Sequence, residues 1–442
     1  MMYSLEKIIR IIYTKFPLIF RTDAFFNHIK QNIINMLQKC DGEKSESVKK
    51  TGSYDIQSLG ELLQFMDNTD SKVYGREIIE AYEENVNRTI LLVSHELSLS
   101  GAPLVLLHLA ESLKSKGFQT IIICGRDGEM FSDNAALKEI PVIFYPELPK
   151  SDLIARIRKL FTKIIINTIR CAYAIHQLNA TDSSVIWWIH EAGSCYGRRS
   201  AKEMPYMVAD NIKIYTVGPY SRKMVVSRFP GYKVNNFTYS VPDLLQTSNS
   251  SDFQIDLPDK KIFALFGSVI YRKGQDVLIS AIKRLPEKVR KGCFFLFVGN
   301  NLDPQITSML KKFQNEHPDN ILYMDEIKHN DLCRLYNDID FLICTSRDDP
   351  MPVVIAESMS IGKPCICSEH TASAAIIEKY NSGYVYQHNS FSELAQRIEE
   401  AFALNKIKYE EMSKNARRAY EHVFSEQIFE KNLDKFLEED VK

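Results

Sequence analysis

The sequence predicts an α/β protein with two doubly wound domains and an N-terminal helical extension. Short runs rich in β-branched residues alternate with segments of helical periodicity, the pattern of an open parallel sheet covered by helices. A polar segment at residues 244–258 interrupts this alternation, which then begins again. The chain has 442 residues, which is more than one hydrophobic core usually supports.

The composition excludes several classes of protein. Hydrophobic residues make up 45% and charged residues 25%, as in an ordinary globular protein, and a formal net charge of −1 argues against a nucleic-acid partner. The nine cysteines lack C-x-x-C spacing, which indicates reduced thiols. No apolar run reaches the roughly 18–20 residues of a membrane span, and the N-terminus does not resemble a signal peptide. We therefore expect a cytoplasmic protein.

The predicted extension covers residues 1–87. Residues 1–39 interleave large apolar side chains with six basic and two acidic residues, which predicts one or two amphipathic basic helices. A polar linker follows at 40–54, and a short helix is expected within 56–84. The basic helices either lie on an anionic membrane surface or pack on the protein.

The first doubly wound domain is expected at residues 88–243. Its predicted strands are 89–93, 120–124, 142–145, 163–167, 185–189 and 212–217, and its predicted helices include 103–116, 152–160 and 220–229.

The second domain is expected at residues 258–424. Its predicted strands are 262–267, 294–298, 321–324, 341–344 and 364–367. The chain is helical in pattern after about residue 390, and residues 425–442 are predicted to form a C-terminal helix that crosses back to the first domain.

The most informative segment is 346–364, SRDDPMPVVIAESMSIGKP. After a strand, either Asp348 or Asp349 can cap a helix and a proline such as Pro352 suits its first turn, and Gly362 signals its end. The helix N-terminus, with Val353 and Val354 in its first turn, would then lie at the carboxyl edge of the sheet. Free N–H groups there favour an anion such as a diphosphate.

Glu357 lies within this apolar helix, so its charge requires a partner. The hydroxyl groups of a ribose would provide one. Alternatively, Glu357 faces solvent or pairs with a lysine, and Asp349 is only a helix cap.

A second segment, residues 266–276 with the sequence FGSVIYRKGQD, places cations at the same edge. Gly267 allows a ligand to approach the backbone, and Arg272 and Lys273 precede a helix. On its own, such a basic pair can equally be a solvated surface feature.

Together the two segments resemble the C-terminal half of family-4 retaining glycosyltransferases. These have the GT-B architecture, in which two Rossmann-like domains face each other across a cleft. The resemblance covers about residues 89–425. It implies that Asp349 lies beside the donor sugar, that Glu357 binds the ribose, and that Lys273 with Arg272 holds the diphosphate.

The N-terminal half supports the resemblance. Residues 93–107, VSHELSLSGAPLVLL, are similar to the family's first strand and small-residue loop, which implies that Gly101 and Ala102 lie near the donor. His190, in WWIHEAG, matches a family histidine near the transferred sugar. The alternative is a purely structural histidine.

Three positions depart from the family pattern. Asp349 replaces the usual glutamate, and Ser268 stands where an arginine is usual. The later Gly-Gly-x-x-Glu segment begins with Ala374 and Ala375 and keeps Glu378.

The resemblance implies transfer of a sugar from a nucleotide diphosphate with retention at the anomeric carbon. The nucleotide sugar is a co-substrate, and neither a further cofactor nor a metal is expected. The acceptor would be a glycan or a lipid-linked molecule in cell-surface polysaccharide assembly at the inner face of the membrane. Two alternatives remain: a non-catalytic partner subunit with this fold, or another GT-B enzyme such as a sugar-nucleotide epimerase. The sequence contains no G-x-G-x-x-G motif, which argues against a nicotinamide dehydrogenase.

Overall fold

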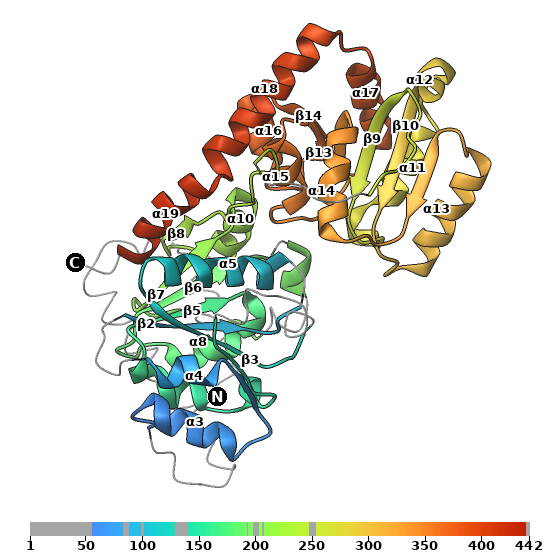
Figure 1. Cartoon of the computed structure of the whole chain (residues 1–442). Helices are drawn as coiled ribbons and strands as arrows, with labels where there is room; N and C mark the ends of the chain where they lie inside the picture. The colour runs from blue at the N-terminus through green and yellow to red at the C-terminus, as the bar shows by residue number, and fades with distance from the viewer. Residues whose placement is uncertain are drawn as a thin grey trace, which may run out of the picture. The chain divides into compact units, whose positions relative to one another are not determined.

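A computed structural model describes residues 55–82, 88–98, 101–128, 140–191, 193–197, 203–205, 207–246 and 253–438. The predicted basic helices at residues 1–39 lie outside these ranges. The chain divides into two compact units between Phe237 and Thr238, and Figure 1 shows a sheet flanked by helices in each.

The first unit is built on an eight-stranded sheet with the order β1-β4-β3-β2-β5-β6-β7-β8. All neighbouring strands are parallel except β1, which runs antiparallel to β4. The strands are β1 Lys72–Tyr74, β2 Thr89–Ser94, β3 Gln119–Cys124, β4 Val142–Phe144, β5 Lys163–Asn167, β6 Val185–Ile189, β7 Ile212–Thr216 and β8 Val234–Asn236.

The described helices of this unit are mostly short. They are α3 Leu59–Asp67, α4 Arg76–Glu80, α5 Gly101–Ser115, η2 Leu148–Lys150, α7 Leu153–Ile157, η3 Arg158–Leu160, η4 Ile169–Cys171, α8 Ala172–Leu178, η5 Gly193–Gly197 and α10 Pro219–Arg228.

The first unit begins earlier than the sequence pattern indicates. The single helix expected within 56–84 is replaced by α3, β1 and α4, and apolar residues of this segment join the core of the sheet. Leu62 is fully buried in that core together with Leu91 and Ile143. Because β1 has only three residues, it is too short to show the alternation of a strand.

The second unit contains a six-stranded, fully parallel sheet with the order β11-β10-β9-β12-β13-β14. The strands are β9 Lys261–Phe266, β10 Cys293–Val298, β11 Ile321–Met324, β12 Phe341–Cys344, β13 Cys365–Ser368 and β14 Gly383–Tyr386. Its helices are η6 Tyr271–Lys273, α11 Gln275–Ile282, α12 Glu287–Gly292, α13 Pro304–Glu316, α14 His329–Asp338, α15 Val353–Ser360, α16 Ala374–Tyr380, α17 Phe391–Phe402, α18 Lys406–Val423 and α19 Glu426–Glu438.

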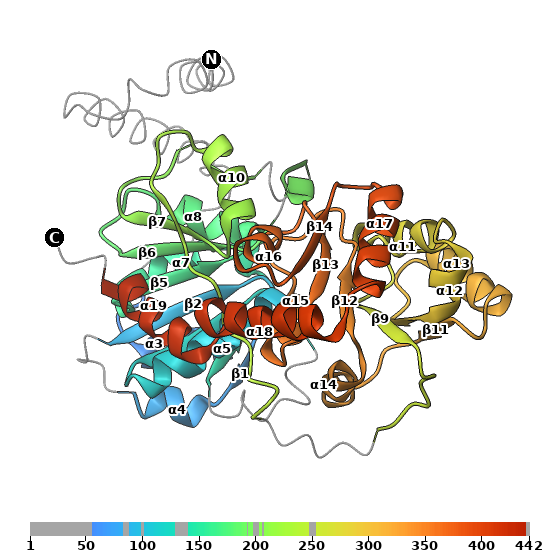
Figure 2. The same ribbon diagram turned by 90° about the horizontal axis from the view of Figure 1, so that it is seen from above.

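Successive side chains of β9 face the two opposite helix layers of this unit. Phe263 and Leu265 belong to the core shared with α11, α13 and α17. Phe266 points to the other face, where its ring meets Tyr336 of α14 edge-on with centroids 5.1 Å apart. Helices α15 and α16 pack on α18 in this second layer (Figures 1 and 2). The two layers give the carboxyl edge of the sheet an α11 side and an α15 side.

Both sheets contain a topological switch point. In the second unit the chain proceeds from β9 to β10 and β11 on one side, and it continues from β12 to β13 and β14 on the other. In the first unit the corresponding break lies between β2 and β5. Ligands of open α/β sheets bind at such points, outside the carboxyl ends of the strands.

The chain enters the second unit before the polar segment expected to separate the domains. The entry segment, residues 238–246, runs along α15 and is bound at both ends of that helix. At one end the hydroxyl of Tyr239 donates to the carbonyl of Met351 at 2.6 Å, and at the other the N–H of Leu244 donates to Ser360 at 3.4 Å. The polar composition of residues 244–258 did not indicate that the entry segment packs on α15.

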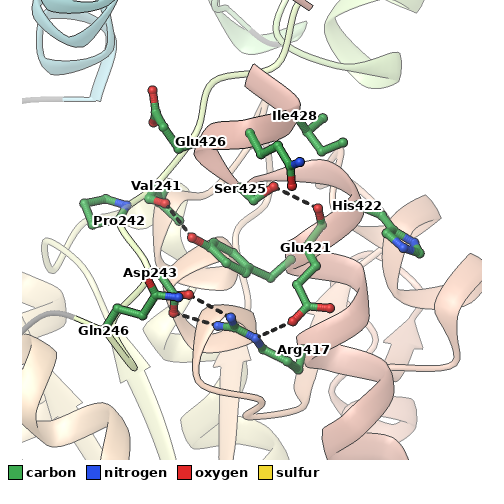
Figure 3. Close-up of a pocket in the computed structure, with 12 residues that line it drawn as sticks. Val241, Pro242, Asp243, Gln246, Arg417, Glu421, His422, Ser425, Glu426 and Ile428 are labelled. Atoms are coloured by element: carbon green, nitrogen blue, oxygen red, sulfur yellow. Dashed lines mark hydrogen bonds and ion pairs between the residues drawn. The ribbon is translucent and has the colours of Figure 1, made fainter. Parts of the chain in front are cut away.

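Arg417 of α18 ties the entry segment to the C-terminal helices. Its guanidinium contacts both carboxylate oxygens of Asp243 at 2.7 Å and also pairs with Glu421 at 2.9 Å (Figure 3). The same guanidinium donates to the carbonyl of Ser360 at the end of α15. A pocket of about 750 Å³ with a mixed polar and apolar lining lies beside α18 and α19 (Figure 3). The predicted crossing of the last helix to the first domain remains a prediction.

Candidate active site

The carboxyl edge of the first sheet carries Gly101, Ala102 and His190. Helix α5 begins at Gly101, just beyond β2, and the side chain of Asn167 donates to the carbonyl of Ala102 at 3.1 Å. Among the described residues, and apart from its chain neighbours and the backbone of its own helix, no atom lies within 4 Å of a Cβ added to Gly101. Packing against these residues therefore does not require a glycine here.

His190 follows β6 and is 7% exposed. Its Nε2 atom is buried without a hydrogen-bond partner among the described residues. Burial, together with the neighbouring His95, lowers the pKa of His190 to about 3, so the imidazole is neutral at physiological pH. An unpartnered buried nitrogen is costly, and a ligand group at this edge would relieve that cost.

Sequence reasoning missed Glu191, which holds two loops of this edge together. One of its carboxylate oxygens accepts the N–H groups of Ile169 and His190, each at 3.1 Å. Burial raises the pKa of Glu191 to about 7, despite these hydrogen bonds. The feature of the sequence that could have indicated Glu191 is its position directly after His190, a predicted site residue.

Thr168, between β5 and η4, was also missed. Its φ of 71° is unusual for a β-branched residue, and its carbonyl and amide are fixed by Trp187 and Trp188. The hydroxyl lies 3.4 Å from Nδ1 of His95, which follows β2. Backbone strain of this kind often lies at functional sites, and here it coincides with the switch point.

In the second unit, the structure brings Lys273, Arg272 and Asp349 together at the ends of β9 and β12. The Lys273 ammonium lies 2.7 Å from the Asp349 carboxylate, and Arg272 lies 3.3 Å from the same oxygen. Asp349 is 5% exposed. Burial alone would raise the pKa of Asp349, but Lys273 and Arg272 hold it below its ordinary value, so the group is ionised.

Asp349 is not the cap of α15, contrary to the simpler alternative. The cap residue is Pro352, which provides no side-chain hydrogen bond, and the helix begins at Val353. Val353 and Val354, both half-buried, therefore form a first turn whose N–H groups no cap side chain satisfies.

Glu357 is 3% exposed, and both of its oxygens have protein partners. Nε2 of His329 lies 2.7 Å from one oxygen, and the Tyr336 hydroxyl donates to the other at 2.7 Å. Contacts with Cys333 and Glu357 raise the pKa of His329 to about 10, so an imidazolium faces the carboxylate. The alternatives of a solvent-facing or lysine-paired glutamate are wrong. His329 and Tyr336 lie on α14, in a part of the sequence without a motif that would predict them as partners of Glu357.

Two glycines fix the loop that presents Lys273. Gly267 has a φ of 137°, and a Cβ there would lie 3.7 Å from the Lys273 side chain. Gly274 has a φ of 72°, and a Cβ there would lie 2.3 Å from the carbonyl oxygen of Thr345. Thr345 in turn donates its hydroxyl to the Lys273 carbonyl at 2.8 Å. The loops after β9 and β12 are thus joined directly.

The second-unit cluster is suited to binding a multiply charged anion. Two cations face one buried carboxylate beside an uncapped helix N-terminus, which leaves a local excess of positive charge. In the described part of the chain, no group of three or more His, Cys, Asp or Glu side chains is arranged to hold a metal ion. Among the described helices, none is long and apolar enough to cross a membrane.

Comparison with known proteins relates both halves of the chain to glycosyltransferases. Residues 248–419 match the family model of glycosyl transferases group 1, and residues 86–213 match that of glycosyl-transferase family 4. Spore coat protein SA of Bacillus subtilis is 25% identical over 273 residues, which cover 58% of this chain and 72% of that protein. The glycogen synthase of Thermodesulfovibrio yellowstonii is 22% identical over 259 residues, 58% of this chain, and the match spans 49% of that enzyme.

A solved structure shows the same fold. HepE of Anabaena, in complex with UDP, superposes with a TM-score of 0.64 at 16% identity, over 79% of this chain and 99% of that one. The similarity confirms the predicted fold of two parallel-sheet, Rossmann-like units.

Proposed function

On the premise that both halves of this chain are related to family-4 glycosyltransferases of the GT-B fold, we propose that it is a retaining, metal-independent glycosyltransferase. The donor would be a nucleotide-diphosphate sugar, and no further cofactor takes part. The observation that carries the proposal is the meeting of Lys273, Arg272 and Asp349 at the β9–β12 switch point, directly before α15. UDP bound to the structurally similar HepE supports a nucleotide donor.

Negative charge develops on the diphosphate as the bond to the sugar breaks. Lys273 and Arg272 carry two positive charges against the single charge of Asp349, so one positive charge is left to stabilise the leaving group. The N-terminus of α15 adds free N–H groups from Val353 and Val354, beside Pro352. In this proposal these groups take the part that a metal ion plays in other transferases.

Glu357 would bind the ribose. A carboxylate oxygen has two acceptor positions, and each oxygen of Glu357 uses one of them for His329 or Tyr336. The second position on each oxygen remains for one ribose hydroxyl, so the nucleotide can bind without displacing the protein partners.

The proposal is tested first by nucleotide binding and then by turnover. Purified protein is heated with UDP, GDP, dTDP or ADP, and we expect one of these to raise the melting temperature. The corresponding nucleotide sugar is then supplied with methyl glycosides as acceptors, and release of the nucleotide is measured with the anomeric configuration of the new glycosidic bond. No stabilisation by any of the four would contradict the proposal. Binding without turnover would identify a non-catalytic subunit, and an altered sugar still attached to nucleotide would identify an epimerase.

We propose that His190, with Gly101 and Ala102, contacts the transferred sugar. His190→Ala should lower transfer by about 10- to 100-fold and leave affinity for the bare nucleotide nearly unchanged, because Nε2 of the neutral imidazole has no partner among the described residues and a sugar hydroxyl would supply one. Transfer rates and nucleotide dissociation constants are measured for both proteins. Equal losses in the two measurements would refute the role.

We also propose that residues 1–39 bind an anionic membrane surface, which would place the enzyme beside a lipid-linked acceptor in polysaccharide assembly. The segment carries six basic and two acidic residues, and each basic residue near an anionic leaflet contributes about 1 kcal/mol. Full-length protein should co-sediment with vesicles of phosphatidylglycerol and phosphatidylcholine in low salt. A chain beginning at Asp55 should remain in the supernatant, and equal sedimentation of both would reject the idea.

A further inference from the structure

The two oxygens of the Glu191 carboxylate have different surroundings. Oε2 accepts the N–H groups of Ile169 and His190, each at 3.1 Å, so the loops after β5 and β6 fix the orientation of the carboxylate. Oε1 accepts no hydrogen bond from another described residue, and Glu191 is only half-buried. Oε1 is therefore available to a ligand at the carboxyl edge of the first sheet.

A purely structural contact would not require a carboxylate at this position. The amide oxygen of a glutamine could accept the same two N–H groups without placing an ionised group in a crowded site. Because burial raises the pKa of Glu191 to about 7, folding favours the protonated form, and ionisation costs stability as the pH rises through this range. Carboxyl groups that carry such a cost are typical of functional sites.

Glu191 is the group of its surroundings that changes charge near neutral pH. Among the described residues, the titratable side chains that face it are Arg170, Cys171, Tyr196 and the adjacent His190. Burial raises the pKa of the Cys171 thiol and of the Tyr196 hydroxyl, and it lowers that of His190, so all three are neutral at pH 7. The positive charge of Arg170, which is exposed, offsets only part of the effect of burial on Glu191.

His190 links Glu191 to the proposed reaction. Under the proposed function His190 contacts the transferred sugar, and the acceptor oxygen must reach the anomeric carbon of that sugar. Glu191 follows His190 directly and binds its N–H, beside the strained backbone of Thr168 at the switch point. Among the described residues, Nε2 of His190 and the hydroxyl of Tyr196 are both buried without a partner, and a ligand rich in hydroxyl groups would supply partners.

We propose that Oε1 of Glu191 is the general base that takes the proton of the acceptor hydroxyl. The inference rests on the proposed function and extends it by assigning the proton transfer to a residue. The acceptor oxygen forms a bond to the anomeric carbon while the bond from that carbon to the diphosphate breaks. The electron pair of the broken bond leaves with the nucleotide, and the hydroxyl proton passes to Glu191. A base that titrates near the working pH suits this step. The leaving diphosphate is the alternative base.

The test compares full-length wild-type protein with Glu191→Gln in transfer to the methyl glycosides, over about pH 5.5–9. Glutamine keeps an oxygen for the two N–H groups but cannot take a proton. Wild-type kcat/KM should fall about tenfold per pH unit below about pH 7. Glu191→Gln should be about 10²- to 10⁴-fold slower without this decline. Its affinity for UDP should be unchanged, and its melting temperature should equal or exceed that of the wild type.

Glu147→Gln is the matched control, because Glu147 is exposed and pairs with Lys150 at 3.8 Å. This variant should keep the wild-type rate and pH profile. Infrared spectra give a readout independent of turnover, since a carboxyl band that titrates near pH 7 should be present in the wild type and absent from Glu191→Gln.

The outcomes separate this inference from the proposed function. Absence of both nucleotide binding and transfer in the wild type contradicts the proposed function itself. If the wild type transfers sugar, a wild-type rate in Glu191→Gln overturns the inference alone. A slower Glu191→Gln that keeps the decline below pH 7 identifies the diphosphate as the base and also overturns it. A wild-type profile without that decline overturns it even where Glu191→Gln fails to fold.

Discussion

Replacing Lys273 with alanine is expected to lower kcat/KM for sugar transfer by about 10²- to 10³-fold, the usual effect of removing one group that stabilises developing negative charge. Lys273 is the cation nearest the buried Asp349, at 2.7 Å, and it lies in the loop fixed by Gly267 and Gly274. Without it, one positive charge would remain against one carboxylate, and the excess charge available to the diphosphate would vanish. Initial rates at varied donor concentration give the two kinetic constants.

Two variants control this measurement. Lys273→Arg keeps the charge and should retain more activity than Lys273→Ala. Lys288→Ala removes an exposed lysine of α12 and should have no effect. Lys273→Ala should stay folded, because Arg272 at 3.3 Å and the hydroxyl of Ser346 at 3.3 Å still contact Asp349. Wild-type kinetics in a folded Lys273→Ala protein would remove Lys273 from the site.

Glu357→Gln is expected to weaken nucleotide binding by about 10- to 100-fold, the value of one or two charge-assisted hydrogen bonds. The amide of glutamine has only one acceptor oxygen, whereas His329 and Tyr336 both approach as donors. The free energy of unfolding should therefore also fall, by about 1–3 kcal/mol. Isothermal calorimetry and urea unfolding measure the two effects.

A comparison of UDP with 2′-deoxy-UDP makes this test specific to the ribose. Wild-type protein should prefer UDP, and Glu357→Gln should lose most of that preference. Glu410→Gln removes a carboxylate that, among the described residues, forms an exposed helical pair with Lys406, and it should change neither affinity nor stability. An unchanged preference for UDP in Glu357→Gln would place the ribose elsewhere.

Much of the fold could be predicted because buried parallel strands are continuous apolar runs. All eleven strands expected from the sequence form, with ends within one residue of the prediction. The three strands that were missed, β1, β8 and β14, have three or four residues each and include lysine, asparagine or glycine. Strands β4, β11, β12 and β13 are equally short, but they are mainly apolar runs and were predicted.

The candidate site was predictable where a functional side chain lies in a loop directly after a strand. Lys273 and Asp349 follow β9 and β12, neighbours in the sheet, so their meeting could be expected from topology alone. The partners of Glu357 could not be expected, because His329 is 28 positions away and Tyr336 is 21 positions away on a helix without a motif. Such contacts depend on how α14 and α15 pack, which no local spacing encodes.

The attachment of the entry segment to α18 makes the order of biosynthesis matter for the donor helix. Asp243 and Arg417 are 174 positions apart, so the aspartate leaves the ribosome about 10–30 s before its partner at ordinary translation speeds. During that interval α15 lacks both the guanidinium at its C-terminal end and the helix on which it packs. The helix that carries Glu357 therefore receives its full support only near the end of translation, and a nascent chain interrupted before Arg417 would lack that support.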